Sequence, residues 1–275
     1  TLIIVPTTIL AMQHHENFTK RFRGYSSVGL ITRNTKLSDK KNILEEYATE
    51  SMDILISTHT AFSFDLKKIK LGLLIVDEEQ HFGVAQKEKI KQIKSDLHLL
   101  TLTATPIPRT LHMSLLGIRG LSLIQTPPID RKSIKTVICK FDNILIKNAL
   151  SKEMARKGQI FRITPRRKDN EVLTKKIQQI SPDAKFVIAH GRLNAIEMEK
   201  SMQDFYSHKS DILISTSIIE SGIDIPRANT LIVNNADRFG LAQLHQLRGR
   251  IGRSHLKAYA YFTLSKNNIT PNAQR

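Results

Sequence analysis

Three acidic residues directly follow a short apolar segment in the first third of the chain. Leu73–Val76 are apolar, and Asp77, Glu78, Glu79 and then Gln80 come next. If the apolar segment is a strand of a parallel sheet, these carboxylates lie at its carboxyl edge, where α/β proteins bind ligands. One carboxylate there can hold Mg²⁺ on a nucleotide, and the next can orient or deprotonate an attacking water. An acidic first turn of a following helix is the alternative explanation.

Hydroxyl side chains follow three other predicted strands of the first half. Thr103 and Thr105 could couple a nucleotide site to a bound nucleic-acid strand, although a turn before proline has the same composition. Residues such as Thr7 and Thr58 can bind a sugar-phosphate backbone through hydroxyls and backbone amides. The residues concerned are Pro6, Thr7, Thr58, His59, Thr103 and Thr105.

The second half contains two further polar segments. Thr216 ends a predicted strand, and Gly222 after it would let backbone amides approach a phosphate, while Asp224 could contact a ribose or the opposite lobe. A helix N-cap with a glycine turn would explain the same residues. Further on, the segment from Gln246 to Arg253 contains three arginines separated by glycines: Arg248, Arg250 and Arg253. Guanidinium groups suit phosphate recognition and phosphoryl transfer, and a solvated basic turn is the alternative.

The composition limits the partners. Lys and Arg number 42 against 25 Asp and Glu, a net charge of +17, which favours a polyanion such as nucleic acid. The single cysteine, Cys139, excludes a disulfide framework or a cysteine-cluster zinc site and is typical of the cytoplasm. The histidines have no metal-ligand spacing. No apolar segment approaches the roughly 18 residues of a membrane span, so no membrane partner is expected.

Short apolar segments alternate with helical patterns along the chain, which predicts α/β lobes with parallel sheets covered by helices. The predicted strands are Leu2–Val5, Ile54–Ile56, Leu71–Val76, Leu97–Leu102, Gln159–Ile163, Phe186–Ala189, Ile212–Ile214, Thr230–Val233 and Ala258–Thr263.

An internal repeat indicates that two similar lobes are present. Ile31–His59 aligns with Ala189–Ser217 without a gap, and both contain the sequence Asp-Ile-Leu-Ile-Ser-Thr, at 53–58 and 211–216. Chance could produce the six identical residues, but the helix positions upstream match as well, which favours a duplication. The matched positions are Leu44 and Tyr47 in the first copy and Met202 and Phe205 in the second, with predicted N-caps at Ser38 and at Asn194, the latter with Glu197.

A proline pair, Pro127 and Pro128, marks the boundary between the lobes because it breaks both helix and strand. We therefore expect residues 1–127 to form the first lobe, 128–140 a linker and 141–275 the second lobe.

Taken in order, these segments resemble motifs Ia to VI of superfamily 2 helicases and translocases. The similarity is greatest to the bacterial transcription-repair coupling factors and next to the RecG-type branch-migration translocases, and it covers nearly the whole chain. Residues 76–84, 102–111, 219–226 and 239–250 are the most specific segments. The resemblance implies two tandem RecA-like lobes that close on ATP and move along the backbone of double-stranded DNA. In that family the motion displaces stalled RNA polymerase and recruits excision-repair proteins, through modules absent from this chain.

The resemblance also implies roles for the candidate residues. Asp77 would hold Mg²⁺ on ATP, and Glu78 would be the catalytic base that orients water. Arg250 and Arg253 would reach the γ-phosphate from the second lobe, so the four groups must face a common gap. Other nucleotide contacts would come from Gln80, Gly222, Asp224 and Gln246, and the DNA path would be lined by Pro6, Thr7, Thr58, His59, Thr103, Thr105 and Thr216.

The chain departs from the family pattern in several places. Most importantly, its 275 residues contain no Gly-x-x-x-x-Gly-Lys-Ser/Thr loop, which in the family precedes the strand that opens this chain and cradles the triphosphate. We therefore expect a first lobe that is truncated at its N-terminus, aggregation-prone and unable to support more than weak ATP hydrolysis. The smaller departures are His81 for Arg, Arg192 for Gln, the pair Asn234-Asn235, and the divergent segment Arg162–Asn170, which keeps Pro165-Arg166.

Three functions stay open on the sequence alone. The chain is part of a duplex-DNA translocase of transcription-coupled repair, part of a RecG-like translocase that acts on branched DNA, or a catalytically inactive chain that binds DNA through its basic surface. RecG-type proteins more often have Asp-Glu-Gln-His in place of the sequence that begins at Asp77. No recognition helix or finger pattern indicates sequence-specific DNA binding.

Overall fold

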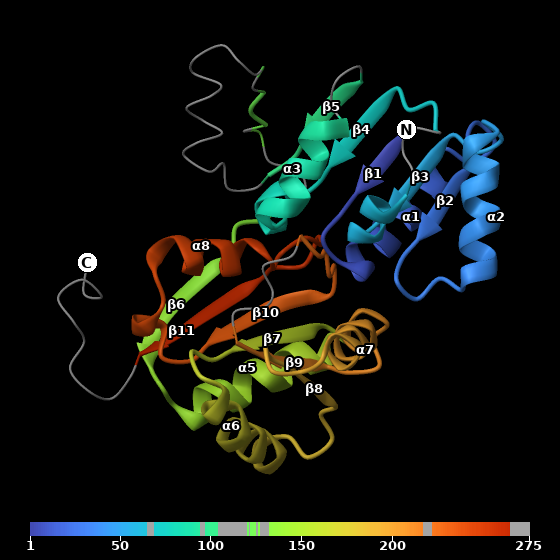
Figure 1. The fold of residues 1–275 in the computed structure, drawn as a ribbon. Coiled ribbons are helices and arrows are strands. Elements are labelled where there is room, and N and C mark those ends of the chain that lie inside the picture. The colour runs from blue at the N-terminus through green and yellow to red at the C-terminus, as the bar shows by residue number, and fades with distance from the viewer. Residues whose placement is uncertain are drawn as a thin grey trace. The chain divides into compact units, whose positions relative to one another are not determined.

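The computed structural model describes residues 1–64, 69–93, 97–103, 120, 122–124, 126, 132–216 and 222–264. The chain divides into two compact units, Thr1–Gln125 and Thr126–Arg275. Each unit contains one parallel sheet with helices on both faces (Figure 1), which confirms the predicted α/β class. Among the helices of the described residues, none is long and apolar enough to cross a membrane.

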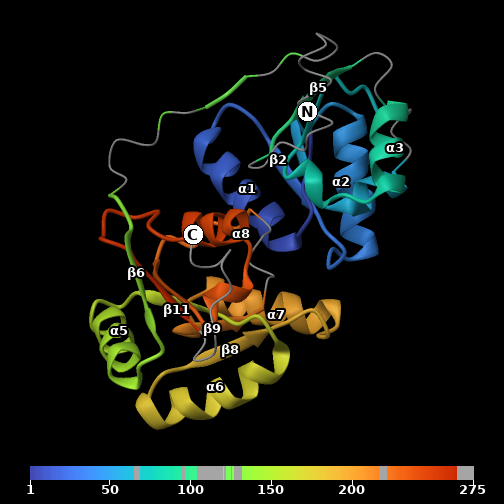
Figure 2. The same cartoon turned by 90° about the vertical axis from the view of Figure 1, so that its left-hand side faces the viewer.

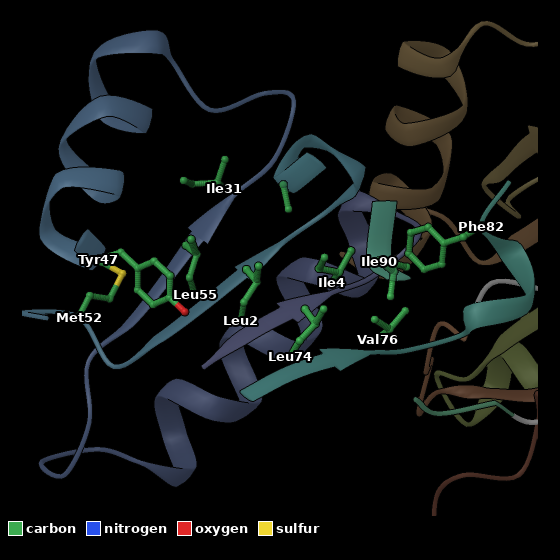
Figure 3. Close-up of a cluster of buried hydrophobic side chains, with 11 residues drawn as sticks. Leu2, Ile4, Ile31, Tyr47, Met52, Leu55, Leu74, Val76, Phe82 and Ile90 are labelled. Carbon is green, nitrogen blue, oxygen red and sulfur yellow. The ribbon is translucent and has the colours of Figure 1, made fainter. Parts of the chain in front are cut away.

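The first unit contains a five-stranded sheet with the order β2-β3-β1-β4-β5. Its strands are β1 (Leu2–Ile4), β2 (Val28–Ile31), β3 (Ile54–Ser57), β4 (Leu73–Val76) and β5 (His98–Thr101). They are connected through α1 (Thr8–Arg21), α2 (Leu37–Ala48), η1 (His59–Ser63), η3 (Glu79–His81) and α3 (Val84–Ile93). Leu2, Leu55 and Leu74 come from three adjacent strands and form the centre of a buried apolar cluster (Figure 3).

Strand β5 lies at one edge of this sheet, and two apolar residues near its end are partly exposed. Leu100 is 46% exposed and Leu102 is 39% exposed. Apolar side chains on an edge strand favour pairing between molecules. This exposure supports the expected aggregation of the first unit, which stays a prediction.

The second unit contains a six-stranded sheet with the order β6-β11-β10-β7-β9-β8. Its strands are β6 (Lys135–Lys140), β7 (Gln159–Ile163), β8 (Phe186–Ala189), β9 (Ile212–Ser215), β10 (Ala228–Val233) and β11 (Tyr259–Leu264). Helices α5 (Asn143–Ala155) and α6 (Arg167–Ile180) lie on one face, and α7 (Ala195–Tyr206) and α8 (Leu241–Gly249) on the other (Figure 2). The short η6 (Ala236–Arg238) follows β10.

The two units repeat the same arrangement, as the sequence alignment predicted. Helices α1 and α6 each have 14 residues, and α2 and α7 each have 12 at matching alignment positions. Asp53 of the first shared hexapeptide accepts a hydrogen bond from the backbone N–H of Ser27 at 2.8 Å, and Asp211 of the second accepts one from that of Lys185 at 2.9 Å. The identical aspartates therefore join the same two neighbouring strands in each unit, and the predicted repeat of two similar lobes is confirmed.

Some sequence predictions need correction. All nine predicted strands form, but β2 and β6 were missed. Gly29 interrupts the apolar pattern of β2 because a Cβ at that position would lie 2.3 Å from the Met52 sulfur. β6 occupies residues 135–140 of the expected linker, because this segment pairs with β11 along its whole length. Ser38 is not the cap of α2: the helix begins at Leu37 after Lys36, whereas the capping box of Asn194 and Glu197 is present in α7.

Arg162 lies in the interior of the second unit, in the divergent segment. Its side chain is fully buried, and its Nε donates to Asn234 Oδ1 at 3.2 Å. Its two terminal nitrogens have no hydrogen-bond partner among the residues that the structure describes. Burial without a carboxylate partner lowers the pKa of Arg162 to about 10. The divergent segment therefore places a charge in the core that no carboxylate among the described residues compensates.

Candidate functional site

The acidic segment of the first unit lies at the carboxyl edge of the sheet, as predicted. The backbone N–H of Asp77 donates to Ile4 O at 3.0 Å, so the chain stays attached to β1 for one residue past the end of β4. Glu78 then adopts the left-handed conformation with φ 52°, and η3 follows. This turn directs the chain away from the sheet, and the two carboxylates stand at the turn itself.

Asp77 is held by groups on both of its carboxylate oxygens. Its Oδ1 accepts from the backbone N–H of Glu78 at 2.8 Å, and its Oδ2 is 2.9 Å from Nε2 of His14 on α1. Both side chains of the His14–Asp77 pair are about one-fifth exposed, at 23% and 19%. Sequence analysis missed His14, because 63 residues separate it from Asp77 and no local pattern connects them.

Glu78 is connected to the end of the neighbouring strand. It is a buried residue, and its carboxylate accepts a hydrogen bond from the side-chain amide of Gln80. The amide oxygen of Gln80 accepts in turn from the Thr103 hydroxyl at 2.7 Å, just past the end of β5. A side-chain path thus runs from Glu78 to Thr103, and the structure brings together three of the predicted residues. Thr105 lies outside the described residues.

The remaining first-unit candidates follow β1 and β3. Thr7 is the N-cap of α1, and its hydroxyl accepts from the backbone N–H of Leu10 at 3.3 Å. Pro6 precedes it and is partly buried. Thr58 is almost fully buried, whereas His59 begins η1 and is exposed. His59 is therefore available to a ligand, and Thr58 contributes mainly to the turn.

In the second unit the structure pairs two candidates. Arg253 Nη1 lies 3.4 Å from Asp224 Oδ1, so the two side chains form an ion pair. Arg250 is the C-cap residue of α8, and Gln246 is exposed on the same helix. Gly222 has φ +66°, the left-handed conformation that glycine adopts without strain.

A basic pocket lies at the carboxyl ends of β7, β8 and β9. It has a volume of about 240 Å³ and contains Thr216, the predicted DNA contact, together with cationic side chains that sequence analysis did not select. His190 faces this pocket, and its Nδ1 is buried with no hydrogen-bond partner among the described residues. The lining residues are Arg166, Lys168, His190, Gly191, Arg192 and Thr216. Such a set of donors is suited to a phosphate group.

This pocket could have been predicted from the equivalence of the two units. Val5 N donates to Ser57 O at 3.0 Å in the first unit, and Thr164 N donates to Ser215 O at 2.9 Å in the second. Pro6 and Pro165 each follow at once, so Pro6-Thr7 and Pro165-Arg166 occupy equivalent places. The contact with a sugar-phosphate backbone that was predicted for Thr7 could therefore have been predicted for Arg166 as well.

The donor set at the first-unit edge fits a magnesium nucleotide in part. Mg²⁺ typically takes one or two protein carboxylates, and phosphate oxygens and water complete its shell. Within the described ranges, no group of three or more His, Cys, Asp or Glu side chains could hold a metal ion by itself. Asp77 and Glu78 can supply the carboxylates, and the phosphates of a nucleotide must supply the remaining ligands.

Two family models match the chain. Residues 1–114 match the model described as DEAD/DEAH box helicase, and residues 141–255 match the helicase conserved C-terminal domain. The two matches fall in the two structural units.

Curated relatives and solved structures agree with these models. The transcription-repair-coupling factor of Bacillus subtilis is 48% identical over 97% of this chain, and that of Escherichia coli is 44% identical over 99%. The chain spans 23% and 24% of the length of these two relatives. A structure of RecG bound to a three-way DNA junction superimposes with a TM-score of 0.80 at 32% identity, covering 99% of this chain and 36% of that one. RNA-bound Dbp5 of Saccharomyces cerevisiae, at 18% identity and a TM-score of 0.67, shares the fold.

Proposed function

We propose that this chain, whose two units match the models of the DEAD/DEAH box helicase and the helicase conserved C-terminal domain, is part of the ATP-driven motor of a transcription-repair coupling factor. The observation that carries the proposal is the Asp77–Glu78 pair at the end of β4, with the path from Glu78 through Gln80 to Thr103. It combines a carboxylate for Mg²⁺, a base and a hydroxyl relay at one sheet edge.

In this proposal each unit contributes part of the nucleotide site. Asp77 would hold Mg²⁺ through water, and Glu78 would orient the attacking water and take its proton. Bound ATP would supply the phosphoanhydride bond whose cleavage drives the motor. Arg250 and Arg253 would stabilise the charge on the transferred phosphoryl group once the units close, and Asp224 would keep Arg253 in position until then.

The polypeptide of these 275 residues should hydrolyse ATP very slowly by itself. Without a phosphate-cradling loop it lacks several charge-assisted hydrogen bonds, each worth about 1.5–3 kcal/mol. We expect phosphate release with saturating DNA at less than about one hundredth of a typical enzyme turnover of about 10 s⁻¹. A turnover near the typical value would show that the cradle is dispensable.

A chimaera tests the motor directly. In it, the segment that precedes the matched region in the Bacillus subtilis relative is joined to Thr1, and phosphate release is measured with and without duplex DNA. We expect the chimaera to gain hydrolysis that DNA stimulates. If the chimaera folds and binds DNA but hydrolyses no ATP with any DNA, the motor proposal is wrong and an inactive DNA-binding chain remains.

The basic pocket of the second unit would bind a phosphate of the DNA backbone. Replacing both Arg166 and Arg192 by Gln should weaken duplex binding by about 100-fold at low salt, because each arginine makes a charge-assisted contact. The slope of log affinity against log salt should also fall by about 2, at about 0.9 per phosphate contact. Fluorescence anisotropy with a labelled duplex measures both quantities.

The matched control for this variant removes two positive charges at the amino ends of the strands, away from the pocket at their carboxyl ends. Lys157 and Lys185 are exposed. Lys157 lies two residues before β7, and Lys185 lies directly before β8. The double substitution to Gln should change affinity by less than about threefold, through the general field alone. Equal losses in both double variants would mean that total charge, and not the pocket, binds DNA.

A RecG-like action on branched DNA is the second candidate, favoured by the similarity to the RecG–junction structure. Forked DNA would then stimulate the chimaera more strongly than a linear duplex of equal length. The coupling-factor proposal also includes contacts with RNA polymerase and excision-repair proteins, for which the support is the similarity to the relatives. It further includes a cytoplasmic location, for which the support is the single cysteine.

A further inference from the structure

Strand β6 forms one edge of the second sheet. It has six residues and pairs with β11 from Lys135 to Lys140 (Figure 1). In the described part of the chain no strand pairs with its other side, so half of its backbone N–H and C=O groups have no strand partner. Proteins normally shorten, bulge or cover such an edge, because it is a template for an added strand.

One face of this edge borders an apolar groove between β6, β11 and α8. The groove has a volume of about 430 Å³, and its floor includes Phe262. Ile138 of β6 is 67% exposed, and Leu241 of α8 is 72% exposed. Asp237, His245 and Arg248 are the ionisable residues of the same lining. A groove lined mainly by apolar side chains with a few polar groups is typical of a binding surface.

The other face of the same edge is cationic. Lys135 stands beside Tyr259 in the sheet register, and Lys152 of α5 places its Nζ 4.5 Å from the centre of the Tyr259 ring. Lys152 also donates to the Tyr259 hydroxyl at 3.2 Å, and this bond with the nearby cations lowers the pKa of that hydroxyl. Glu153 beneath the patch is buried and already accepts from Arg156 and Thr230. The patch therefore has excess positive charge.

These two faces specify the chemistry of an added strand. Because side chains of a strand alternate between faces, every second residue of a partner strand would enter the groove and the others would lie along the cations. We propose that β6 binds an extended segment of a partner protein in which acidic and apolar residues alternate. Lysines at both ends of β6 oppose purely apolar strands and favour acidic ones. None of the residues named here is a nucleotide or DNA candidate, although the groove shares α8 with Gln246, and the proposal does not depend on the motor activity.

The probe is a fluorescent six-residue peptide of alternating glutamate and valine, the length of β6. In anisotropy titrations, Ile138→Asp should weaken its binding to the full chain by about 10-fold or more, the value of one buried apolar side chain. Ile196→Asp is the matched control, since Ile196 is 74% exposed on α7. Lys135→Glu should also weaken binding, and a peptide with glutamates replaced by lysines should not bind.

Backbone methylation tests the added strand itself. Peptides with N-methyl groups on one alternate set of amides should lose binding, and those with the other set methylated should keep it, because only one set faces β6. The proposal is overturned if both sets bind alike or if Ile138→Asp and Ile196→Asp behave alike. It is also overturned if duplex DNA displaces the peptide completely, or if sedimentation shows that β6 of a second copy occupies the edge.

Discussion

Replacing Glu78 by Gln in the chimaera should lower DNA-stimulated ATP turnover by about 10²- to 10⁴-fold, the usual contribution of a general base. The amide keeps the shape of the side chain and can still accept the hydrogen bond from Gln80, so the turn should survive. It cannot take a proton from water. The loss should therefore appear in turnover, with nucleotide affinity changed little, and single-turnover phosphate release measures it.

The neighbouring carboxylate supplies the control. Glu79 lies next in the chain, in the first position of η3, and is partly buried. Glu79→Gln removes the same charge from the same turn, so it reproduces any general electrostatic effect on Mg²⁺ or DNA. If the two variants lose activity equally, Glu78 acts through charge and is not the base. A Glu78→Gln variant that keeps more than about one tenth of the original turnover would also show that Glu78 is not the base.

The left-handed conformation of Glu78, taken alone, suggests backbone strain that serves catalysis. The equivalent turn of the second unit shows that the conformation belongs to the fold. Asn235 occupies the equivalent place after β10 and has φ 50°, and η6 follows it as η3 follows Glu78. The second unit thus makes the same turn with a residue that adopts this conformation more easily. The turn belongs to the fold, and the special feature of the first unit is its pair of carboxylates.

Local patterns were sufficient for most of the fold. Apolar segments predicted nine strands, and the shared hexapeptide predicted the repeat because its aspartate performs the same task in both units. The missed strands show the limit of such patterns: β2 contains a glycine that packing against Met52 requires, and β6 is an edge strand bounded by lysines.

The candidate site was predictable only where it follows strand ends. Asp77, Glu78 and Thr103 were found because parallel strands bring their carboxyl ends to one edge. His14 was not, because its contact with Asp77 comes from the packing of α1 and leaves no trace in the local sequence. The sequence marked Arg192 only as a departure from the family pattern, and it took the structure to show that Arg192 lines the same pocket as Arg166.

Replacing Phe205 by Ala should lower the free energy of unfolding of the second unit by about 3–5 kcal/mol, the usual cost of removing a buried aromatic ring. Phe205 is fully buried on α7, and its ring centre lies 5.3 Å from that of Phe161 on β7. Its backbone oxygen also accepts a hydrogen bond from the buried Gln159 side chain at 2.7 Å. Hydrogen exchange measured peptide by peptide gives the loss separately for each unit.

The repeat provides a control at the equivalent position of the first unit, where a substitution can keep the buried ring and remove only its hydroxyl. Tyr47 occupies the Phe205 position in the first unit; it is buried, its hydroxyl has no partner in the described residues, and burial raises its pKa. Tyr47→Phe should therefore keep or increase the stability of the first unit, since an unpaired buried hydroxyl is removed and the ring remains. If Phe205→Ala releases protection in first-unit peptides as strongly as in second-unit peptides, the units do not unfold independently. The effect of Tyr47→Phe would then also spread over both units, because one cooperative transition would report every buried position alike.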